Sequence, residues 1–478
     1  MPAPSEFLSW VDASKDAFIA RLSHAVSIPS ISGDPAYRPR VQEMSDWLNA
    51  ELKKVGVETK QVDLGSHVMD GQTLPLPHAI LGKIGNDKNK KTVLIYGHFD
   101  VQPAALSDGW ASEPFVLTTL PDGRLVGRGS SDDKGPVLGW LAVLQWHHET
   151  QTPLPVNLRF CFEGMEENGS EGLDELVERE REGWFGGVDC MCISDNYWLN
   201  TRKPALTYGL RGLVYFKINV SGPGRDLHSG VFGRTVHEPM TDLISLMSRL
   251  VDAQGRILVP GVDDMVSAAG IEEREIYEKL DYSIADVEGA AGGKIALSDD
   301  KTTVLMGRMR LPSLSLHGIE GAFAGPGAKT VIPAKVGGKF SIRLVPPQTP
   351  DSVEPLVKTY LESEFAKLGS KNKMVVELLH SGKPWVADWK HWNYTAAIKA
   401  TELIYKQTPD LTREGGSIPV TLTFAEQLGV NVLLLPMGRG DDGAHSTNEK
   451  LDTKNFIEGT KLLGTYLYEI GDVKETGK

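Results

Sequence analysis

The hydrophobic pattern of the first half of the chain alternates between the periods of helices and of strands. Apolar residues spaced three and four apart predict amphipathic helices at about 7–26 and 41–55, with a Pro- and Ser-rich loop between them. From Lys91 onward, short apolar runs alternate with helical segments. Strands are predicted at 92–97, 156–162 and 188–194, and helices at 136–148 and 173–185. Nearly continuous apolar strands separated by helices predict an α/β fold, in which a mainly parallel sheet carries helices on both faces.

The pattern changes after Gly209 and returns near Trp385. Two half-buried strand patterns, LVYFKINVSG and GGKFSIRLVP, are each followed by a helix pattern, and a polar, Gly-rich stretch at about 252–300 lies between them. The helices of this part are predicted at 238–251 and 355–368, and a helix at 393–405, a strand at 430–436 and a helix at 453–470 follow. We therefore predict an α/β domain formed by residues 1–208 and 386–478, interrupted by an inserted α+β domain at 209–385.

The composition is that of an ordinary globular protein. Of 478 residues, 41% are hydrophobic and 24% are charged, which argues against a disordered or collagen-like chain. The net charge of −13 argues against nucleic-acid binding and against attraction to an anionic membrane. The sequence shows neither a signal-peptide pattern at its start nor an apolar run of about 18 residues, so we expect a cytoplasmic protein.

Three cysteines are too few for a disulfide framework. Cys190 and Cys192 lie two apart in a predicted strand, where they could form a redox or metal-binding pair. We favour the simpler interpretation, in which both are small apolar side chains of a buried strand.

Five segments place acidic or histidine side chains just after a predicted strand, at the edge where open α/β sheets bind ligands. In the first, YGHFD, His98 and Asp100 lie two apart. Because side chains two apart in an extended chain face the same way, the two can act together. A carboxylate commonly orients a metal-bound imidazole. The pattern is weak by itself, since a histidine at a strand end is more often a surface residue.

A glycine-rich loop, GRGSSDDKG, leads into the helix predicted at 136–148. It lacks the spacing of a phosphate-binding loop, and its two aspartates would repel phosphate. One aspartate is expected to cap the helix, whereas a carboxylate here could also bridge two metal ions. The spacing leaves open whether Asp132 or Asp133 is the metal ligand.

Two further segments directly follow strands. In FEGMEENG, the neighbouring carboxylates of Glu166 and Glu167 point in different directions, so that one could bind a metal and the other serve as general base. A solvated acidic loop is the commoner meaning of such a run. In SDN, Asp195 is either a ligand or part of an Asx-turn.

The last segment, GRGDDGAHS, contains a literal GxGxxG from Gly438 to Gly443. The context argues against a dinucleotide site, because no apolar helix follows and Asp441 and Asp442 would lie where the pyrophosphate binds. His445 in this glycine-rich loop fits a metal ligand better. Two histidines and several carboxylates at strand ends suit a pair of divalent cations, Zn²⁺ or Mn²⁺.

In this order and spacing, the segments resemble the co-catalytic metallopeptidase family that includes carnosinase, aminoacylase and the bacterial tripeptidases. The similarity is greatest to its dipeptidase branch, and between residues 96 and 446 it is carried by YGHFDVQPA, GRGSSDDKGP, FEGMEENGS, ISDNYWL, YGLRG, LHSG, TREGGSIP and GRGDDGAHS. The resemblance implies hydrolysis of dipeptides, among them the Cys-Gly of glutathione breakdown, by a water that two metal ions activate. It also implies that the inserted domain is a lid that forms a homodimer.

The family pattern implies five metal ligands and two catalytic residues. The ligands are Asp132 as the bridge, His98 and Asp195 on one ion, and Glu167 and His445 on the other. The catalytic residues are Asp100, which would orient the histidine, and Glu166, which would be the general base.

The resemblance also implies contacts to the substrate. His228, supplied by the other subunit of the dimer, would help to stabilise the oxyanion. Arg343 would bind the free carboxylate of the dipeptide. Further contacts would come from Thr330, His380, Gly416 and Ser417.

Two alternatives stay open at this point. A protein of the same fold with an inactive site would bind metal or act as a scaffold, but the complete ligand set and the presence of Glu166 argue against it. Among enzymes, hydrolysis of an N-acyl amino acid would use the same metals and base. The motifs YGLRG and REGGSIP of the dipeptidase branch favour a dipeptide.

Overall fold

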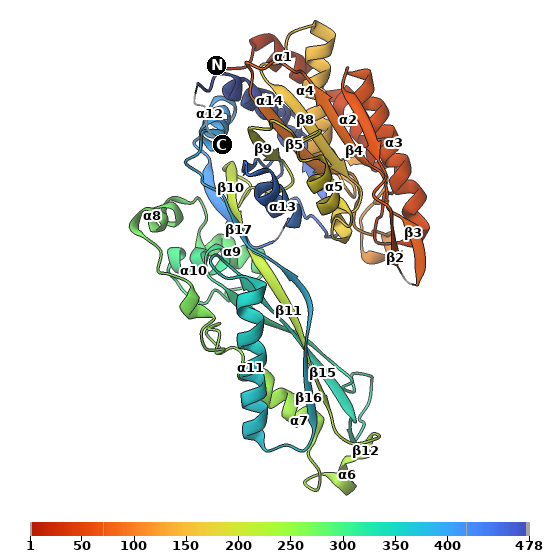
Figure 1. The fold of residues 1–478 in the computed structure, drawn as a ribbon, viewed down its shortest axis with the longest axis vertical. Helices are drawn as coiled ribbons and strands as arrows, with labels where there is room; N and C mark the ends of the chain where they lie inside the picture. The colour runs from red at the N-terminus through yellow and green to blue at the C-terminus, as the bar shows by residue number, and fades with distance from the viewer. Residues whose placement is uncertain (1, 70, 417, 475–478) are drawn as a thin grey trace.

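Two β-sheets form the two parts of the molecule seen in Figure 1. The computed structural model describes residues 2–69, 71–416 and 418–474. The larger part lies at the top of Figure 1, and the smaller, elongated part extends below it. The predicted fold class, an α/β body interrupted by an inserted α+β domain, is confirmed. The domain boundaries after residues 208 and 385 stay a prediction.

Within the described residues, nine strands form the large sheet. From one edge to the other they are β1 (Glu58–Val62), β4 (Ala79–Ile84), β8 (Asn157–Glu163), β5 (Thr92–His98), β9 (Cys190–Ile193), β19 (Asn431–Leu434), β10 (Ala205–Leu210) and β17 (Trp385–Val386), with β18 (Asp410–Glu414) paired to β10. The central strands β8, β5, β9 and β19 run parallel, as predicted, and antiparallel pairs flank them. Strand β5 is buried along its whole length, which explains why most of its residues are apolar.

Helices cover both faces of the large sheet. Val93 and Ile95 of β5 face one hydrophobic core, whereas Leu94 and Tyr96 face another, because successive strand residues alternate in direction. The first core is completed by α1 (Ser5–Ala13), α2 (Lys15–Val26), α3 (Arg38–Lys54), α4 (Lys134–Thr150), α12 (Trp392–Tyr405) and α14 (Thr453–Gly471). The second core is completed by α5 (Leu173–Glu180) and α13 (Pro419–Leu428). The large sheet is therefore the middle of three layers.

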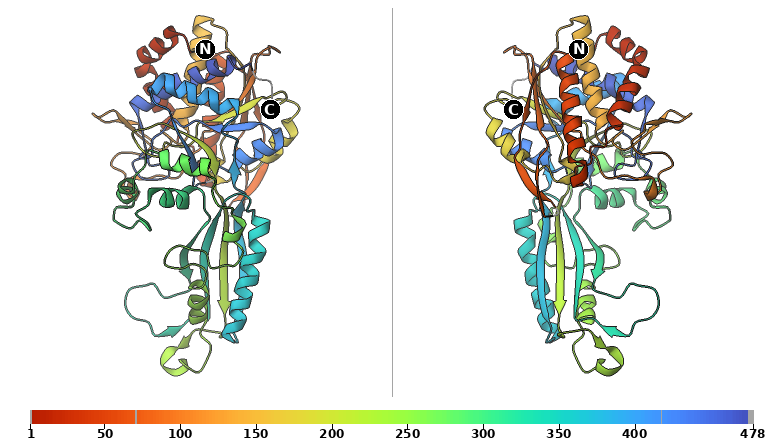
Figure 2. Two further views of the ribbon diagram at one scale, coloured as in Figure 1. Left: turned by 90° about the vertical axis from the view of Figure 1, so that its left-hand side faces the viewer. Right: turned by 90° about the vertical axis from the view of Figure 1, so that its right-hand side faces the viewer.

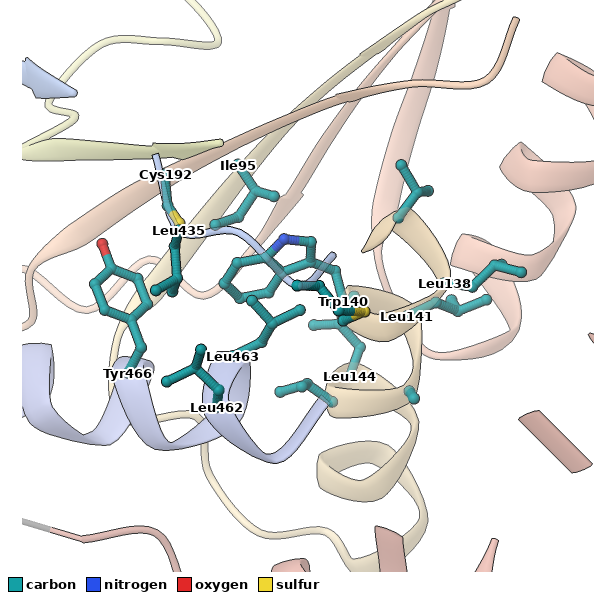
Figure 3. Packing of buried hydrophobic residues seen from close by; sticks show 14 of the residues in the cluster. Ile95, Leu138, Trp140, Leu141, Leu144, Cys192, Leu435, Leu462, Leu463 and Tyr466 are labelled. Atoms are coloured by element: carbon teal, nitrogen blue, oxygen red, sulfur yellow. The ribbon is translucent and has the colours of Figure 1, made fainter. Parts of the chain in front are cut away.

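The first core also explains the two neighbouring cysteines. In Figure 3, Trp140 of α4 lies near Leu463 of α14, and Cys192 belongs to the same cluster. Cys190 and Cys192 are both free thiols and fully buried. The interpretation of the pair as small apolar side chains is confirmed.

The smaller part is built on a four-stranded antiparallel sheet. Its order is β13 (Ser313–Glu320), β15 (Lys335–Leu344), β11 (Gly212–Ser221) and β16 (Lys373–Gly382). Helices α7 (Pro239–Met247) and α11 (Pro350–Leu368) pack on one face of this sheet and bury Val214 and Phe216 of β11. The chain enters through β11 and leaves through the neighbouring β16, so the inserted domain hangs from one pair of strands (Figure 2).

Three short helices occupy a stretch in which the sequence predicts no element. They are α8 (Ile271–Lys279), α9 (Ile284–Ala291) and α10 (Lys301–Met309). Tyr277, Leu280 and Leu305 form a small core between them, and Glu273 of α8 pairs with Arg413 of β18 at 2.7 Å. So small a core needs few apolar residues. Because few apolar positions recur at helical spacing, the polar, Gly-rich sequence shows no clear helical period.

The sequence also predicts no element for the strands β1, β4, β10, β13, β16 and β18 or for helix α13, and the other differences lie at the ends of predicted elements. The helix predicted at 7–26 is two helices, because Ser14 leaves helical geometry with ψ of 3°. Helix α11 begins before the predicted Pro355, because the side chain of Thr349 caps it by accepting the N–H of Ser352. The short elements are β2 (Ser66–Met69), β3 (Gln72–Pro75), β6 (Thr118–Thr119), β7 (Arg124–Val126), β12 (Leu227–His228), α6 (Ser229–Phe232), β14 (Val331–Ile332) and β20 (Lys450–Asp452). None of the helices in the described part of the chain is long and apolar enough to cross a membrane.

Candidate metal centre

The carboxyl ends of three neighbouring strands supply the first side chains of the site. His98 is the last residue of β5, Asp195 follows β9 by two residues, and Glu167 lies in a single helical turn after β8. Because β8, β5 and β9 are parallel neighbours, these three ends meet at one edge of the sheet. The buried strands therefore fix the positions of the polar residues that follow them.

Two loops from other parts of the chain bring the remaining ligand candidates. Asp132 lies in the glycine-rich loop before α4, and His445 lies in the loop between β19 and β20, with a left-handed φ of 59°. Asp133 precedes α4 at the N-cap position, but its carboxylate caps no helical N–H and instead accepts the N–H of His98 at 3.2 Å. The geometry thus answers the question that the spacing left open, because Asp132 and not Asp133 faces the two histidines.

Five side chains form two groups that share Asp132. In the first group, His98 Nε2 lies 3.0 Å from Asp132 Oδ1 and 3.5 Å from Asp195 Oδ2. In the second, His445 Nε2 lies 3.1 Å from Asp132 Oδ2 and 2.9 Å from Glu167 Oε2. In each group, one ligand atom per residue lies within 4.8 Å of the others. The two oxygens of the shared aspartate therefore face different groups.

This donor set fits two divalent cations. Each group offers one imidazole nitrogen and two carboxylates, which are ligands that Zn²⁺ and Mn²⁺ accept. Three carboxylates outnumber the two imidazoles, so even with both rings protonated the group keeps an excess of negative charge that cations would balance. No such excess is needed to build a stable strand edge, so the set is better explained by metal binding than by packing.

The same charges act on the histidines. Burial of the His98 ring disfavours its charged form, but Asp195, Asp100 and Asp132 overcome this effect and raise its pKa well above the usual value. Hydrogen bonds to two of the carboxylates raise the pKa of His445 to about 10. Both positions therefore favour positive charge.

Asp100 connects His98 to the loop that carries the two glutamates. The Nδ1–H of His98 donates to the backbone oxygen of Asp100 at 3.1 Å, and a carboxylate oxygen of the same aspartate lies 3.4 Å away. This leaves Nε2 as the nitrogen that faces the cluster. The carboxylate of Asp100 also accepts the N–H of Glu166 at 3.2 Å and of Glu167 at 3.1 Å. The aspartate thus orients the histidine and holds the glutamate loop.

Glu166 lies partly buried beside the cluster. Burial raises the pKa of its carboxyl group, His98 opposes the shift, and Asp195 and Glu167 add to it, so that the pKa lies well above its usual range. A carboxyl group with a raised pKa exchanges a proton closer to neutral pH, which is the property that a general base needs.

A third group of carboxylates already holds a cation of the chain itself. Lys450 Nζ lies 2.9 Å from Asp441, 2.6 Å from Asp442 and 2.5 Å from Asp452. The ammonium group occupies the position that a metal ion would take. We therefore assign this group to anchoring the loop that carries His445.

Arg343 and His380 lie on the same face of the small sheet. Arg343 pairs with Leu213 of β11, and His380 pairs with Tyr215 of the same strand. Residues opposite each other in antiparallel strands share a face, so these side chains point away from α7 and α11. Within the described residues, the guanidinium group of Arg343 forms no ion pair. A half-buried cation without a carboxylate partner is suited to bind an anion.

His228 and Thr330 lie together at the far tip of the inserted domain, away from the cluster. His228 belongs to β12, which pairs with β14 directly after Thr330, and both side chains are exposed. Figure 1 places β12 at the end of the inserted domain opposite the large sheet. Gly416 is exposed in the loop after β18, and Ser417 lies outside the described residues. One chain alone therefore does not bring His228 to the metal ligands.

Two side chains of the site escape sequence reasoning. The backbone N–H and the side-chain amide of Gln102 donate to the carboxylate of Glu167 at 3.2 and 2.8 Å. The buried carboxylate of Glu449 accepts the backbone N–H of Asp132 at 3.1 Å. Gln102 lies shortly after Asp100 in the sequence, and Glu449 lies shortly after His445. This proximity to predicted site residues is the one sequence signal by which the two could have been identified.

Comparison with known proteins agrees with this geometry. The profile of peptidase family M20/M25/M40 matches residues 94–469. The chain is 56% identical over 463 residues to the Cys-Gly metallodipeptidase of Schizosaccharomyces pombe, a match that covers 97% of both chains. The solved structure of a dipeptidase from Saccharomyces cerevisiae superposes with a TM-score of 0.88 at 49% identity, covering 98% of both chains. Human carnosine dipeptidase 1 superposes with a TM-score of 0.89 at 43% identity, covering 99% of this chain and 100% of that one. The chain thus belongs to peptidase family M20/M25/M40.

Proposed function

We propose that this protein is a dinuclear metallodipeptidase that hydrolyses Cys-Gly and related dipeptides. The observation that carries the proposal is the carboxylate of Asp132, whose two oxygens face two separate groups of metal-ligating side chains. Membership of a peptidase family supports the reaction, and the high identity to a Cys-Gly metallodipeptidase supports the substrate class.

Each group of ligands would hold one divalent ion, Zn²⁺ or Mn²⁺. His98 and Asp195 would bind the first ion, Glu167 and His445 the second, and Asp132 both. When bound, two such ions lower the pKa of a water molecule and polarise the peptide carbonyl.

Glu166 is the proposed general base. Its carboxylate takes a proton from the attacking water and later gives that proton to the leaving amine. Asp100 supports this role by accepting the backbone N–H of Glu166 at 3.2 Å, which keeps the base beside the ligands. A fixed base needs no rearrangement when the substrate arrives.

Arg343 is the proposed partner of the substrate's C-terminal carboxylate. A guanidinium group binds a carboxylate through two parallel hydrogen bonds, and Arg343 has no ion pair among the described residues that would compete. His380 shares the same face of the sheet and would add a further contact. Gly416 and Ser417 are proposed as further substrate contacts.

We further propose a homodimer in which His228 and Thr330 of one subunit reach the site of the other. The support is their exposed position at the tip of the inserted domain, remote from the ligands of their own chain. The imidazole of His228 would donate a hydrogen bond to the oxyanion that develops during attack.

We also infer a cytoplasmic protein. Its three cysteines are free and buried, which is typical of proteins in a reducing compartment. The acidic net charge of −13 also argues against nucleic acid or an anionic membrane as a partner.

The substrate class can be tested with four compounds. The metal-loaded protein should hydrolyse Cys-Gly, Ala-Gly and β-Ala-His with much higher kcat/KM than N-acetylmethionine, because the related proteins are dipeptidases. The measurement is release of the C-terminal amino acid at several substrate concentrations. Hydrolysis of the acetylated compound alone would contradict the dipeptidase and favour the N-acyl amino acid as substrate.

Glu166→Gln should lower kcat for Cys-Gly by about 10²–10⁴-fold, because an amide cannot take a proton from water. The variant should still bind two metal ions, since the five ligands are unchanged. Glu171→Gln is the matched control: Glu171 lies in the same loop, half-exposed, and pairs with His67. Equal loss of activity in both variants would show that the loop, and not the proton transfer, was disturbed.

Arg343→Met should remove the preference for a free C-terminal carboxylate. We expect wild-type protein to cleave Ala-Gly with higher kcat/KM than Ala-glycinamide, and the variant to lose about ten- to hundredfold on the acid only, as for a lost hydrogen bond to a charged group. The ratio of the two kcat/KM values is the measurement. A ratio unchanged by the substitution would assign the carboxylate to another residue.

The shared site can be tested by mixing two inactive subunits. His228→Ala and Glu166→Gln homodimers should both be nearly inactive. A purified mixed dimer should regain about half of wild-type turnover, because one of its two sites combines Glu166 with the partner's intact histidine. A mixed dimer without activity would mean that His228 acts within its own chain, and an active His228→Ala homodimer would mean that it does not act at all.

A further inference from the structure

Glu449 is a fully buried carboxylate that no ligand set contains. We infer that it is a positioning residue, which holds the loop of Asp132 against the loop of His445 and so sets the spacing of the two metal sites. The inference rests on the proposed two-metal site.

Glu449 accepts five hydrogen bonds from the loop that carries Asp132. Its Oε1 accepts the N–H and the hydroxyl of Ser131 at 3.0 and 3.2 Å, and the N–H of Asp132 at 3.1 Å. Its Oε2 accepts Nη1 of Arg128 at 2.7 Å and the N–H of Gly129 at 3.0 Å. Through these hydrogen bonds, one carboxylate holds together the turn that leads to the bridging aspartate.

The same residue belongs to the loop that carries His445. Its backbone oxygen accepts the N–H of Gly127 at 3.0 Å, and Arg128 Nη2 donates to the backbone oxygen of Ser446 at 3.3 Å. Arg128 and Glu449 form a buried ion pair, and each of the two also contacts the backbone of the opposite loop. The pair therefore joins the two loops.

This connection matters because the other ligand candidates are held differently. His98 and Asp195 follow strands of the large sheet, and Glu167 is fixed by Asp100 and Gln102. Asp132 and His445 instead lie in glycine-rich loops. Their mutual position depends on the contacts between these loops, and Glu449 makes most of those contacts.

The donors around Glu449 require a carboxylate. All five groups donate, and both oxygens accept from at least two of them. A glutamine of the same size offers one acceptor oxygen, and its NH₂ group would face either Arg128 or the N–H groups of Ser131 and Asp132. Glu449→Gln should therefore spread the two loops apart while the volume of the core stays the same.

The direct test is a calorimetric titration of chelator-treated protein with Mn²⁺. Wild-type protein should bind two ions per chain. Glu449→Gln should bind at least one of them about 10- to 100-fold more weakly, the size of effect seen when groups behind metal ligands are removed. Glu449→Gln protein with wild-type affinity for both ions would overturn the inference.

Glu364→Gln is the matched control. Glu364 is a buried carboxylate that also pairs with an arginine, Arg249, but it lies on α11 of the inserted domain and contacts neither the Asp132 loop nor the His445 loop. It should keep wild-type Mn²⁺ affinity. An equal loss of affinity in this control would reduce Glu449 to one of several general stabilisers and overturn its positioning role.

A second variant and a second readout separate positioning from folding. Arg128→Lys keeps the charge but not the two-pronged contact to Glu449 and Ser446, and it should also weaken Mn²⁺ binding. Thermal unfolding of the metal-free variants shows whether each is folded. A lower unfolding temperature with unchanged Mn²⁺ affinity in both variants would mean a merely structural residue. Failure of the two-metal proposal would appear separately, as wild-type protein that binds fewer than two ions.

Discussion

The arrangement of the site depends on one carboxylate that faces two ways. Asp132 directs one oxygen to His98 and the other to His445, and without it the two groups of ligands would be separate and incomplete. Such a buried carboxylate is costly unless opposite charge compensates it. The surrounding histidines, and the cations that fit the donor set, provide that compensation. The rest of the large domain can be understood as a frame that holds this carboxylate in place.

The frame has two parts: a set of buried strands, and two loops that are joined to each other by hydrogen bonds. The parallel strands β8, β5 and β9 place His98, Asp195 and the glutamate loop at one edge of the sheet. Two layers of helices bury both faces of those strands. The loops of Asp132 and His445 come from elsewhere and are joined through Glu449 and Arg128. The inserted domain is attached through the strand pair β11 and β16, with Arg343 opposite Leu213 near the start of β11 and His228 on β12 at the far tip (Figure 1). In the proposed function, Arg343 binds the substrate of its own chain and His228 reaches that of a partner.

The sequence predicts the central strands and the cluster well, for identifiable reasons. Buried parallel strands such as TVLIYGH leave a strong apolar signal, and the ligands follow directly after them. The sequence could not choose between Asp132 and Asp133 from spacing, because their directions depend on the backbone of the turn. Helices α8–α10 were missed, because they bury only a small core. Glu449 was missed because its five donors come from residues more than 300 positions away, and no local pattern records such a contact.

The most direct test of the central claim is the metal content of the purified protein, measured together with Cys-Gly hydrolysis before and after chelation. The shared carboxylate predicts about two divalent ions per chain, with activity that disappears on chelation and returns with Zn²⁺ or Mn²⁺. Activity that survives complete removal of metal would contradict the account, as would full activity with a single ion per chain.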